Sequence, residues 1–338
     1  MELNALLGQP VALPSLPRTV ALLMNELAQR EPSLRRLNLL FGSDPVLAAR
    51  LLELANAPAH QLTRQVAGIS EALVLLGSAP LQTLVSSATL GTAARAVPGI
   101  NLQQFWRYSL HTAKLARSLA GVVFQNPTAA YTAGLLHGLG ELLIHLGNPQ
   151  KAQSMNTLVL PLDMRRGKIE QRILGYSYSH VSAALAQRWL LPQVVVDALQ
   201  YQAAPFDNTA YEPLAGVIHL AAWRARGREA GLSERELAVS FPGEIGLMLG
   251  LQYVPRLVQA YRSRNLDVVG LTAEEWREFN VSELQRGWPE NSCELMPSDG
   301  RTIGVSAGDI CNLDALNYFR SGRLLIGLCS AFSDSPYW

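Results

Sequence analysis

Histidines and acidic residues are the side chains of this chain that could hold a metal ion, and His137 has the most unusual setting. It lies in an apolar stretch, residues 132–143, that reads as one buried helix with His145 at its surface end. Glu141 follows four residues after His137 and would share its helical face. An imidazole beside a carboxylate could hold a divalent cation, but the next residue is Gly138, which cannot ligate. Whether the other ligands of such a site are present therefore decides between a metalloenzyme and a non-catalytic protein.

Other catalytic motifs are incomplete. The glycines of residues 134–140 lack the spacing and the preceding strand of a dinucleotide-binding loop, and no Gly-x-x-x-x-Gly-Lys-Ser/Thr sequence occurs. The three cysteines have no assignable base. Arg165, Arg166 and Lys168 form a short basic run that would bind phosphate or, as we favour, form a solvated face.

Length, composition and charge exclude several classes of protein. The chain has 338 residues, 49% of them hydrophobic, enough for one large domain or two smaller ones. Its net charge of +1 gives no support for binding to nucleic acid or a membrane surface. No apolar run reaches the roughly 18–20 residues that span a bilayer, and the N-terminus lacks a signal-peptide pattern. We expect a soluble, cytoplasmic protein without membrane insertion or nucleic-acid binding.

Helical periodicity runs through most of the chain. Pro17 and the pair Asp44-Pro45 are start signals, because proline is tolerated in the first turn and an aspartate side chain accepts from the free N–H groups there. Strand-like alternation is almost absent before residue 265. The pattern predicts an all-α domain, with helices over residues 18–30, 46–56, 72–76, 80–94, 102–124, 214–226, 234–240, 243–249 and 254–264.

The character of the sequence changes after residue 265. Residues 271–286 read as one more helix and residues 288–304 as a loop, whereas residues 313–332 are undecided between short strands and a helix. We therefore predict an all-helical domain over residues 1–264. The C-terminal extension, residues 265–338, remains of unknown type, helical or α+β.

Three blocks of sequence, with the stretch around His137, resemble the HDOD family, the all-helical output domains of bacterial signalling proteins related to HD phosphohydrolases. The blocks are residues 43–56, with an Asp-Pro start and an Ala-Asn end; residues 69–77, ending in Leu-Gly; and residues 170–192, ending in Leu-Pro. The order and content of the three blocks support the resemblance more strongly than any single short motif does.

The resemblance covers roughly residues 14–225. It implies an HDOD-type helical bundle with an N-terminal helical part over about 14–95 and an HD-like helical half over about 100–264. HD phosphohydrolases hold their metal through a first histidine, a His-Asp doublet and a later aspartate. The positions that match these ligands here are Tyr108, the pair His137-Gly138, and Ala221 or Ala222.

The resemblance thus implies a degenerate metal site. The remnant candidates are His111, His137, Glu141, Glu170 and His180. Three imidazoles with one carboxylate suit Zn or Fe, yet the carboxylates of the family pattern are missing at both places. We expect no working metal site, no catalytic residue and no cofactor, with His137 and His180 as core histidines bonded to neighbouring backbone.

These observations favour a non-catalytic module of bacterial signal transduction that acts by binding a signalling protein or a small ligand. The partner would bind in a groove between the helical halves or at a surface bearing Trp106, Trp189 and Trp223. The alternative is a metal-dependent phosphohydrolase of a nucleotide or cyclic dinucleotide, with Zn, Fe or Mn at a rearranged histidine site. A receptor that binds a nucleotide without cleaving it lies between the two.

Overall fold

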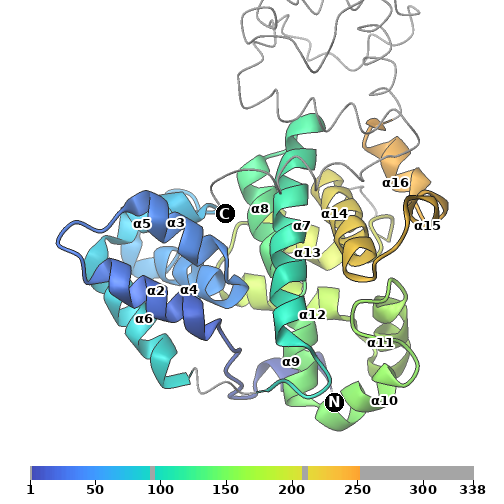
Figure 1. Ribbon diagram of the computed structural model, residues 1–338, viewed down its shortest axis with the longest axis horizontal. Coiled ribbons are helices and arrows are strands. Elements are labelled where there is room, and N and C mark those ends of the chain that lie inside the picture. The colour runs from blue at the N-terminus through green and yellow to red at the C-terminus, as the bar shows by residue number, and fades with distance from the viewer. Residues whose placement is uncertain (1, 92–95, 208–211, 252–338) are drawn as a thin grey trace, which may run out of the picture. The chain divides into compact units, whose positions relative to one another are not determined.

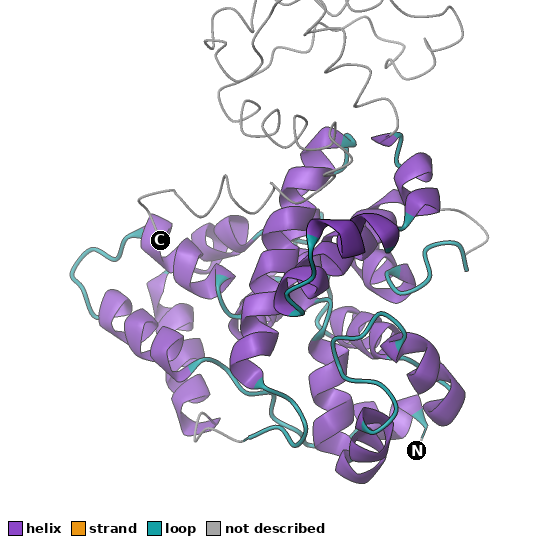
Figure 2. Cartoon of the chain, turned by 45° about the vertical axis from the view of Figure 1, so that its right-hand side comes forward, coloured by secondary structure: helices purple, strands orange, loops and turns teal. Residues whose placement is uncertain are grey.

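The computed structural model describes residues 2–91, 96–207 and 212–251, and the regular elements of this part are helices (Figure 1 and Figure 2). It contains no strand within those residues, so the predicted all-α class is confirmed. The C-terminal extension and the helices predicted at 254–264 and 271–286 lie outside the described residues.

Contacts divide the chain into two compact units. The first comprises residues 1–120 and 124–231, and the second comprises residues 121–123 and 232–338. The boundary that the sequence places at residue 264 lies outside the described residues. All the site residues discussed below belong to the first unit.

The N-terminal half of the first unit is a cluster of short helices, drawn in blue to cyan in Figure 1. Its helices are α1 (Leu3–Leu7), α2 (Pro17–Leu27), α3 (Leu34–Gly42), α4 (Pro45–Ala55), α5 (Ile69–Leu76) and α6 (Ser78–Gly91), with a 3-10 turn at Pro58–His60. Helices α2 to α6 pack on one another, whereas α1 contacts α9 and α12 of the other half.

The start signals read from the sequence act as predicted. The carboxylate of Asp44 accepts from the N–H groups of Val46 at 2.9 Å and Leu47 at 3.0 Å, and Pro45 occupies the first turn of α4. The same carboxylate accepts from the N–H of Leu16, so it also fixes the residue that precedes α2. One capping side chain therefore sets the start of α4 and ties it to α2.

The second half of the first unit carries the candidate site. Its helices are α7 (Leu102–Val122), α8 (Pro127–Leu136), α9 (Leu139–Gly147), α10 (Pro149–Asn156), α11 (Arg166–Leu174), α12 (Tyr178–Arg188), α13 (Gln193–Tyr201) and α14 (Pro213–Glu229). Helix α12 packs against α9 and α13, and α14 packs against α8 and α13. Helix α4 contacts α8 and so joins the two halves.

The described part of the second unit contains α15 (Glu234–Val239) and α16 (Gly243–Met248). Among the described residues, no single helix has the length and apolarity needed to cross a bilayer. The neighbouring helices α5 and α6 meet these two criteria only when taken together, and they are bent by 113° relative to each other.

Candidate functional site

The chain breaks its helix at His137 and Gly138. Helix α8 ends at Leu136 and α9 starts at Leu139, so the single helix predicted over residues 132–143 is wrong. The carbonyl of His137, which leaves the helical ladder, instead accepts from the Ser182 hydroxyl at 2.9 Å and the Gln202 amide at 3.0 Å. Tertiary hydrogen bonds thus stabilise a break whose only local sequence signal is Gly138.

His137 itself is fully buried. Its Nδ1–H donates to the carbonyl of Gly134 at 2.6 Å, which is the backbone partner that the sequence analysis favours. Burial, with the nearby Arg226 charge, lowers the pKa of His137 to about 3, so the ring is neutral at physiological pH. Its Nε2 therefore carries a lone pair and has no hydrogen-bond partner among the described residues.

The remaining candidate histidines lie in other surroundings. His111 Nδ1 lies 3.7 Å from the Glu229 carboxylate. His180 is exposed, with Nδ1 at 2.8 Å from the Ser177 hydroxyl, so its assignment to the core is wrong. It lies at the start of α12, where its ring reaches back to the capping residue. Within the described part of the chain, no group of three His, Cys, Asp or Glu side chains is placed to hold a metal ion.

Glu141 and Glu170 belong to a buried network organised by Arg166. The Arg166 guanidinium reaches Glu141 Oε1 and Glu170 Oε1, each at 2.9 Å. Its Nη1 donates to Asn156 Oδ1 at 2.8 Å and to the Val159 carbonyl at 2.9 Å. Arg166 is fully buried, so its assignment to a solvated face is wrong; two carboxyl groups offset the cost of burying it.

His145 completes this network. It is fully buried, so the prediction of a surface position is wrong. Its Nδ1–H donates to the Pro98 carbonyl at 2.7 Å, and its Nε2 accepts from Arg166 at 3.1 Å. Burial lowers the pKa of His145, which keeps the ring in this neutral tautomer.

The two glutamates share a single positive partner. Burial raises the pKa of Glu170, and the neighbouring Glu141 carboxyl raises it further; burial also raises the pKa of Glu141. The Arg166 charge opposes this rise in both groups, and the Arg226 charge opposes it in Glu141.

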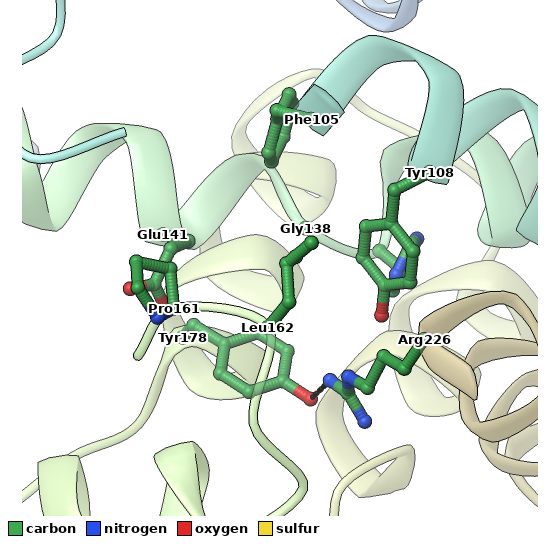
Figure 3. A pocket seen from close by; sticks show the side chains of 9 residues that line it. Phe105, Tyr108, Gly138, Glu141, Pro161, Leu162, Tyr178 and Arg226 are labelled. Atoms are coloured by element: carbon green, nitrogen blue, oxygen red, sulfur yellow. Dashed lines mark hydrogen bonds between the residues drawn. The ribbon is translucent and has the colours of Figure 1, made fainter. Parts of the chain in front are cut away.

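A small pocket lies between the His137 break and this network. Its volume of about 10 Å³ is room for one water molecule. The lining residues are Phe105, Tyr108, His137, Gly138, Glu141, Pro161, Leu162, Tyr178 and Arg226 (Figure 3). Four buried polar atoms of this lining lack hydrogen-bond partners among the described residues: Tyr108 Oη, His137 Nε2, Glu141 Oε2 and Arg226 Nε.

The other binding candidates from the sequence do not line this pocket. Trp106 and Trp223 are buried, so the prediction that they belong to an exposed binding surface is wrong. Trp189 is half-buried. The two buried indoles sit on helices α7 and α14, on faces that pack inward. Arg165 and Lys168 are exposed, and Arg165 pairs with Asp163 at 2.8 Å.

Sequence reasoning missed Arg226 and Tyr178. Arg226 Nη2 donates to the Tyr178 hydroxyl at 2.8 Å, and its guanidinium carbon lies 5.7 Å from the centre of the Tyr108 ring. A signal for Arg226 was present, because it extends the apolar run of α14 with a positive charge. Tyr178 gave no such signal, since tyrosine is common at buried positions.

Comparisons with known proteins agree with this fold. The family model for the HDOD domain matches residues 13–205. The crystal structure of the MmoQ response regulator from Methylococcus capsulatus has 26% sequence identity and a TM-score of 0.55, covering 68% of this chain and 97% of that one. A virulence factor from Campylobacter jejuni has 19% identity and a TM-score of 0.52, covering 73% and 93%, and shows the fold alone.

A curated sequence from Treponema pallidum, an uncharacterized protein, is 24% identical over 212 residues. The match covers 62% of this chain and 41% of that protein. The chain therefore spans about two fifths of the length of this relative.

Proposed function

The chain belongs to the HDOD family, and on this premise we propose that it is a non-catalytic regulatory module of bacterial signal transduction that acts by binding other proteins. Its similarity to a response regulator supports a signalling role. The partner in this proposal is another signalling protein.

The observation that carries this proposal is the dispersal of the metal-binding side chains. His137 is the only one of the three candidate histidines in the described pocket, while His111 lies near Glu229 and His180 contacts Ser177. Glu141 and Glu170 are engaged by Arg166. The pocket also contains the Arg226 guanidinium, whose charge opposes the binding of a cation.

Exposed apolar side chains on the N-terminal helices support protein contacts. Leu39 of α3 is 61% exposed and Val74 of α5 is 70% exposed, and these two helices pack together. Apolar surface on a rigid helix pair is typical of a face that another protein covers.

Elemental mass spectrometry of the purified protein tests the non-catalytic part. We expect no stoichiometric metal and no hydrolysis of nucleotides or cyclic dinucleotides. Stoichiometric Zn, Fe or Mn that disappears in His137→Ala, together with loss of a measured hydrolysis, would establish the phosphohydrolase alternative instead.

Complementation of a deletion strain tests the protein-contact part. We expect the wild type and His137→Ala to restore the transcript profile, and Val74→Glu to fail although it folds. Ile173→Glu is the matched control, since it places the same charge at a half-exposed apolar position of α11. Full restoration by Val74→Glu would remove the α3–α5 face from the proposal.

A further inference from the structure

Arg226 forms no direct ion pair in the part of the chain that the structure describes, although the Glu141 carboxyl lines the same pocket and acts on its charge. None of the ion pairs formed there includes it. Its Nη2 donates to the Tyr178 hydroxyl, and its Nη1 lies 3.3 Å from the sulfur of Met164, which is a weak acceptor. Its Nε–H is buried and unpaired. Arg166, by contrast, pairs directly with two carboxyl groups, so Arg226 is the guanidinium of this region that has room for a directly bound anion.

Tyr108 supplies a second free donor at the same place. Its side chain is 2% exposed, and its hydroxyl has no hydrogen-bond partner among the described residues. Burial raises the pKa of Tyr108, so the hydroxyl keeps its proton. Figure 3 shows the hydroxyl groups of Tyr108 and Tyr178 both directed toward the Arg226 head. Three donor groups from α7, α12 and α14 therefore converge.

The pocket also offers two unpaired oxygen or nitrogen atoms beside these donors, His137 Nε2 and Glu141 Oε2. Burial raises the pKa of Glu141, which favours the protonated carboxyl that can donate to a bound oxyanion. The Nε2 lone pair of His137 is unpaired, and the His137 ring lies 4.8 Å from the Tyr108 ring, centre to centre. A hydroxyl group on a bound molecule would donate to this nitrogen. The set of polar atoms thus favours an anionic group with an attached or adjacent hydroxyl.

We propose that Arg226, Tyr108 and Tyr178 form a binding site for the terminal oxyanion group, carboxylate or phosphate, of a small molecule. The oxyanion accepts from Arg226 Nε–H and from the two tyrosine hydroxyls, and it pairs directly with the guanidinium. This site goes beyond the proposed function, because it needs neither a partner protein nor catalysis.

Space for the oxyanion comes from the loop between α10 and α11. The pocket has room for only one water molecule, and the Leu162 side chain stands in its middle (Figure 3). The segment is anchored at Val159, which is buried and whose carbonyl accepts from Arg166 Nη1 at 2.9 Å. Closer to Leu162, the Asp163 N–H donates locally to the Leu160 carbonyl at 3.0 Å. Leu158 and Leu160 are 63% and 68% exposed and hold the loop by little packing. Outward movement of Leu162 opens the site.

Titration calorimetry of the full chain with inorganic phosphate and, separately, sodium acetate tests the site. We expect saturable binding of at least one probe at a single site, and which one binds identifies the oxyanion. Arg226→Gln should weaken binding about tenfold or more, as expected for loss of a charged hydrogen bond. Arg228→Gln is the matched control: it removes the same charge from an exposed position of the same helix and should leave binding unchanged.

Two further variants keep the proposal falsifiable if Arg226→Gln does not fold, as judged by circular dichroism. Tyr108→Phe removes only the free hydroxyl and should weaken binding several-fold. Leu162→Ala removes the side chain that fills the pocket and should strengthen it. The proposal is overturned if neither probe binds the wild type, if Arg226→Gln and Arg228→Gln weaken binding equally, or if Tyr108→Phe and Leu162→Ala leave it unchanged.

Discussion

At the scale of single residues, the buried charge of Arg166 sets the electrostatics of the HD-like half. A buried ion pair adds little net stability, but removing one partner leaves the other uncompensated. Here two carboxyl groups depend on one guanidinium, and both have raised pKa values because of burial. Arg166 is therefore harder to replace than the glutamates that it binds.

We predict that Arg166→Leu lowers the free energy of unfolding by about 3–5 kcal/mol, because Glu141 and Glu170 lose their shared cation. Urea denaturation followed by circular dichroism at pH 7 measures this loss. Arg165→Leu is the neighbouring control, and we expect it to change the stability little, since Arg165 is exposed. Similar losses in the two variants would contradict the assignment of Arg166 as the centre of the network.

The lowered pKa of His137 predicts a pH dependence of stability. Because the folded state binds the proton only near pH 3, the unfolded chain takes it up first as the pH falls below 6.5. The stabilisation from neutral His137 is therefore complete above pH 6.5 and is lost between pH 6.5 and about 3. Unfolding free energies measured across this window should fall less steeply in His137→Asn, by up to about 1.4 kcal/mol per pH unit. Parallel slopes in the two proteins would mean that the buried ring does not titrate as described.

At the scale of elements, close contact between α9 and α12 depends on Gly140. A Cβ atom there would lie 2.1 Å from the Tyr178 carbonyl oxygen and 2.9 Å from the backbone nitrogen and hydroxyl of Ser182. These backbone atoms cannot move away cheaply. The helices that carry Glu141 and Tyr178 are thus held at a separation that admits only glycine.

We predict that Gly140→Ala destabilises the protein by about 3 kcal/mol, since overpacking must push α9 and α12 apart. Gly167→Ala in α11 is the matched control. Its Cβ would have neighbours no closer than 3.5 Å, so we expect a gain of about 0.5–1 kcal/mol from reduced backbone entropy. Thermal or urea unfolding of both variants gives the comparison, and a Gly140→Ala variant as stable as wild type would refute the close contact.

Helix starts were predictable from sequence because they depend on neighbouring residues. Asp44 and Pro45 satisfy or remove the free N–H groups of the turn that follows them, whatever the rest of the fold does. The break at His137 was not predictable in this way. It depends on Ser182 and Gln202, which bind the His137 carbonyl from 45 and 65 residues away in sequence.

In the candidate site, too, some features were predictable from the sequence and others depend on residues that are distant in the chain. The likeness of the sequence to the family located the His137 region and Tyr108, which both line the pocket. Residue type alone could not separate Arg165 from Arg166, adjacent arginines of which one is exposed and one is fully buried. The burial of the two side chains differs because only Arg166 projects toward α9, where Glu141 supplies a partner.

At the scale of the whole molecule, α14 closes the first compact unit. It contacts α8 and α13, and it contributes Arg226 to the pocket. Its most buried large apolar side chains are Leu214, Val217, Ile218, Leu220 and Trp223. At about 1.5–3 kcal/mol for each fully buried side chain, their burial is on the order of 10 kcal/mol, which is similar to the total stability of a typical domain. The family match ends at residue 205, before this helix begins.

We therefore predict that a fragment of residues 1–231 folds, whereas a fragment of residues 1–205, which ends where the family match ends, does not. The longer fragment retains α14 and stops at the boundary of the compact unit. The shorter one exposes the apolar surfaces of α8 and α13 that α14 covers. Circular dichroism with cooperative thermal unfolding distinguishes the two. A cooperative transition in the 1–205 fragment would mean that the matched region is sufficient on its own, and that α14 serves to deliver Arg226 to the pocket and is not needed to complete the core.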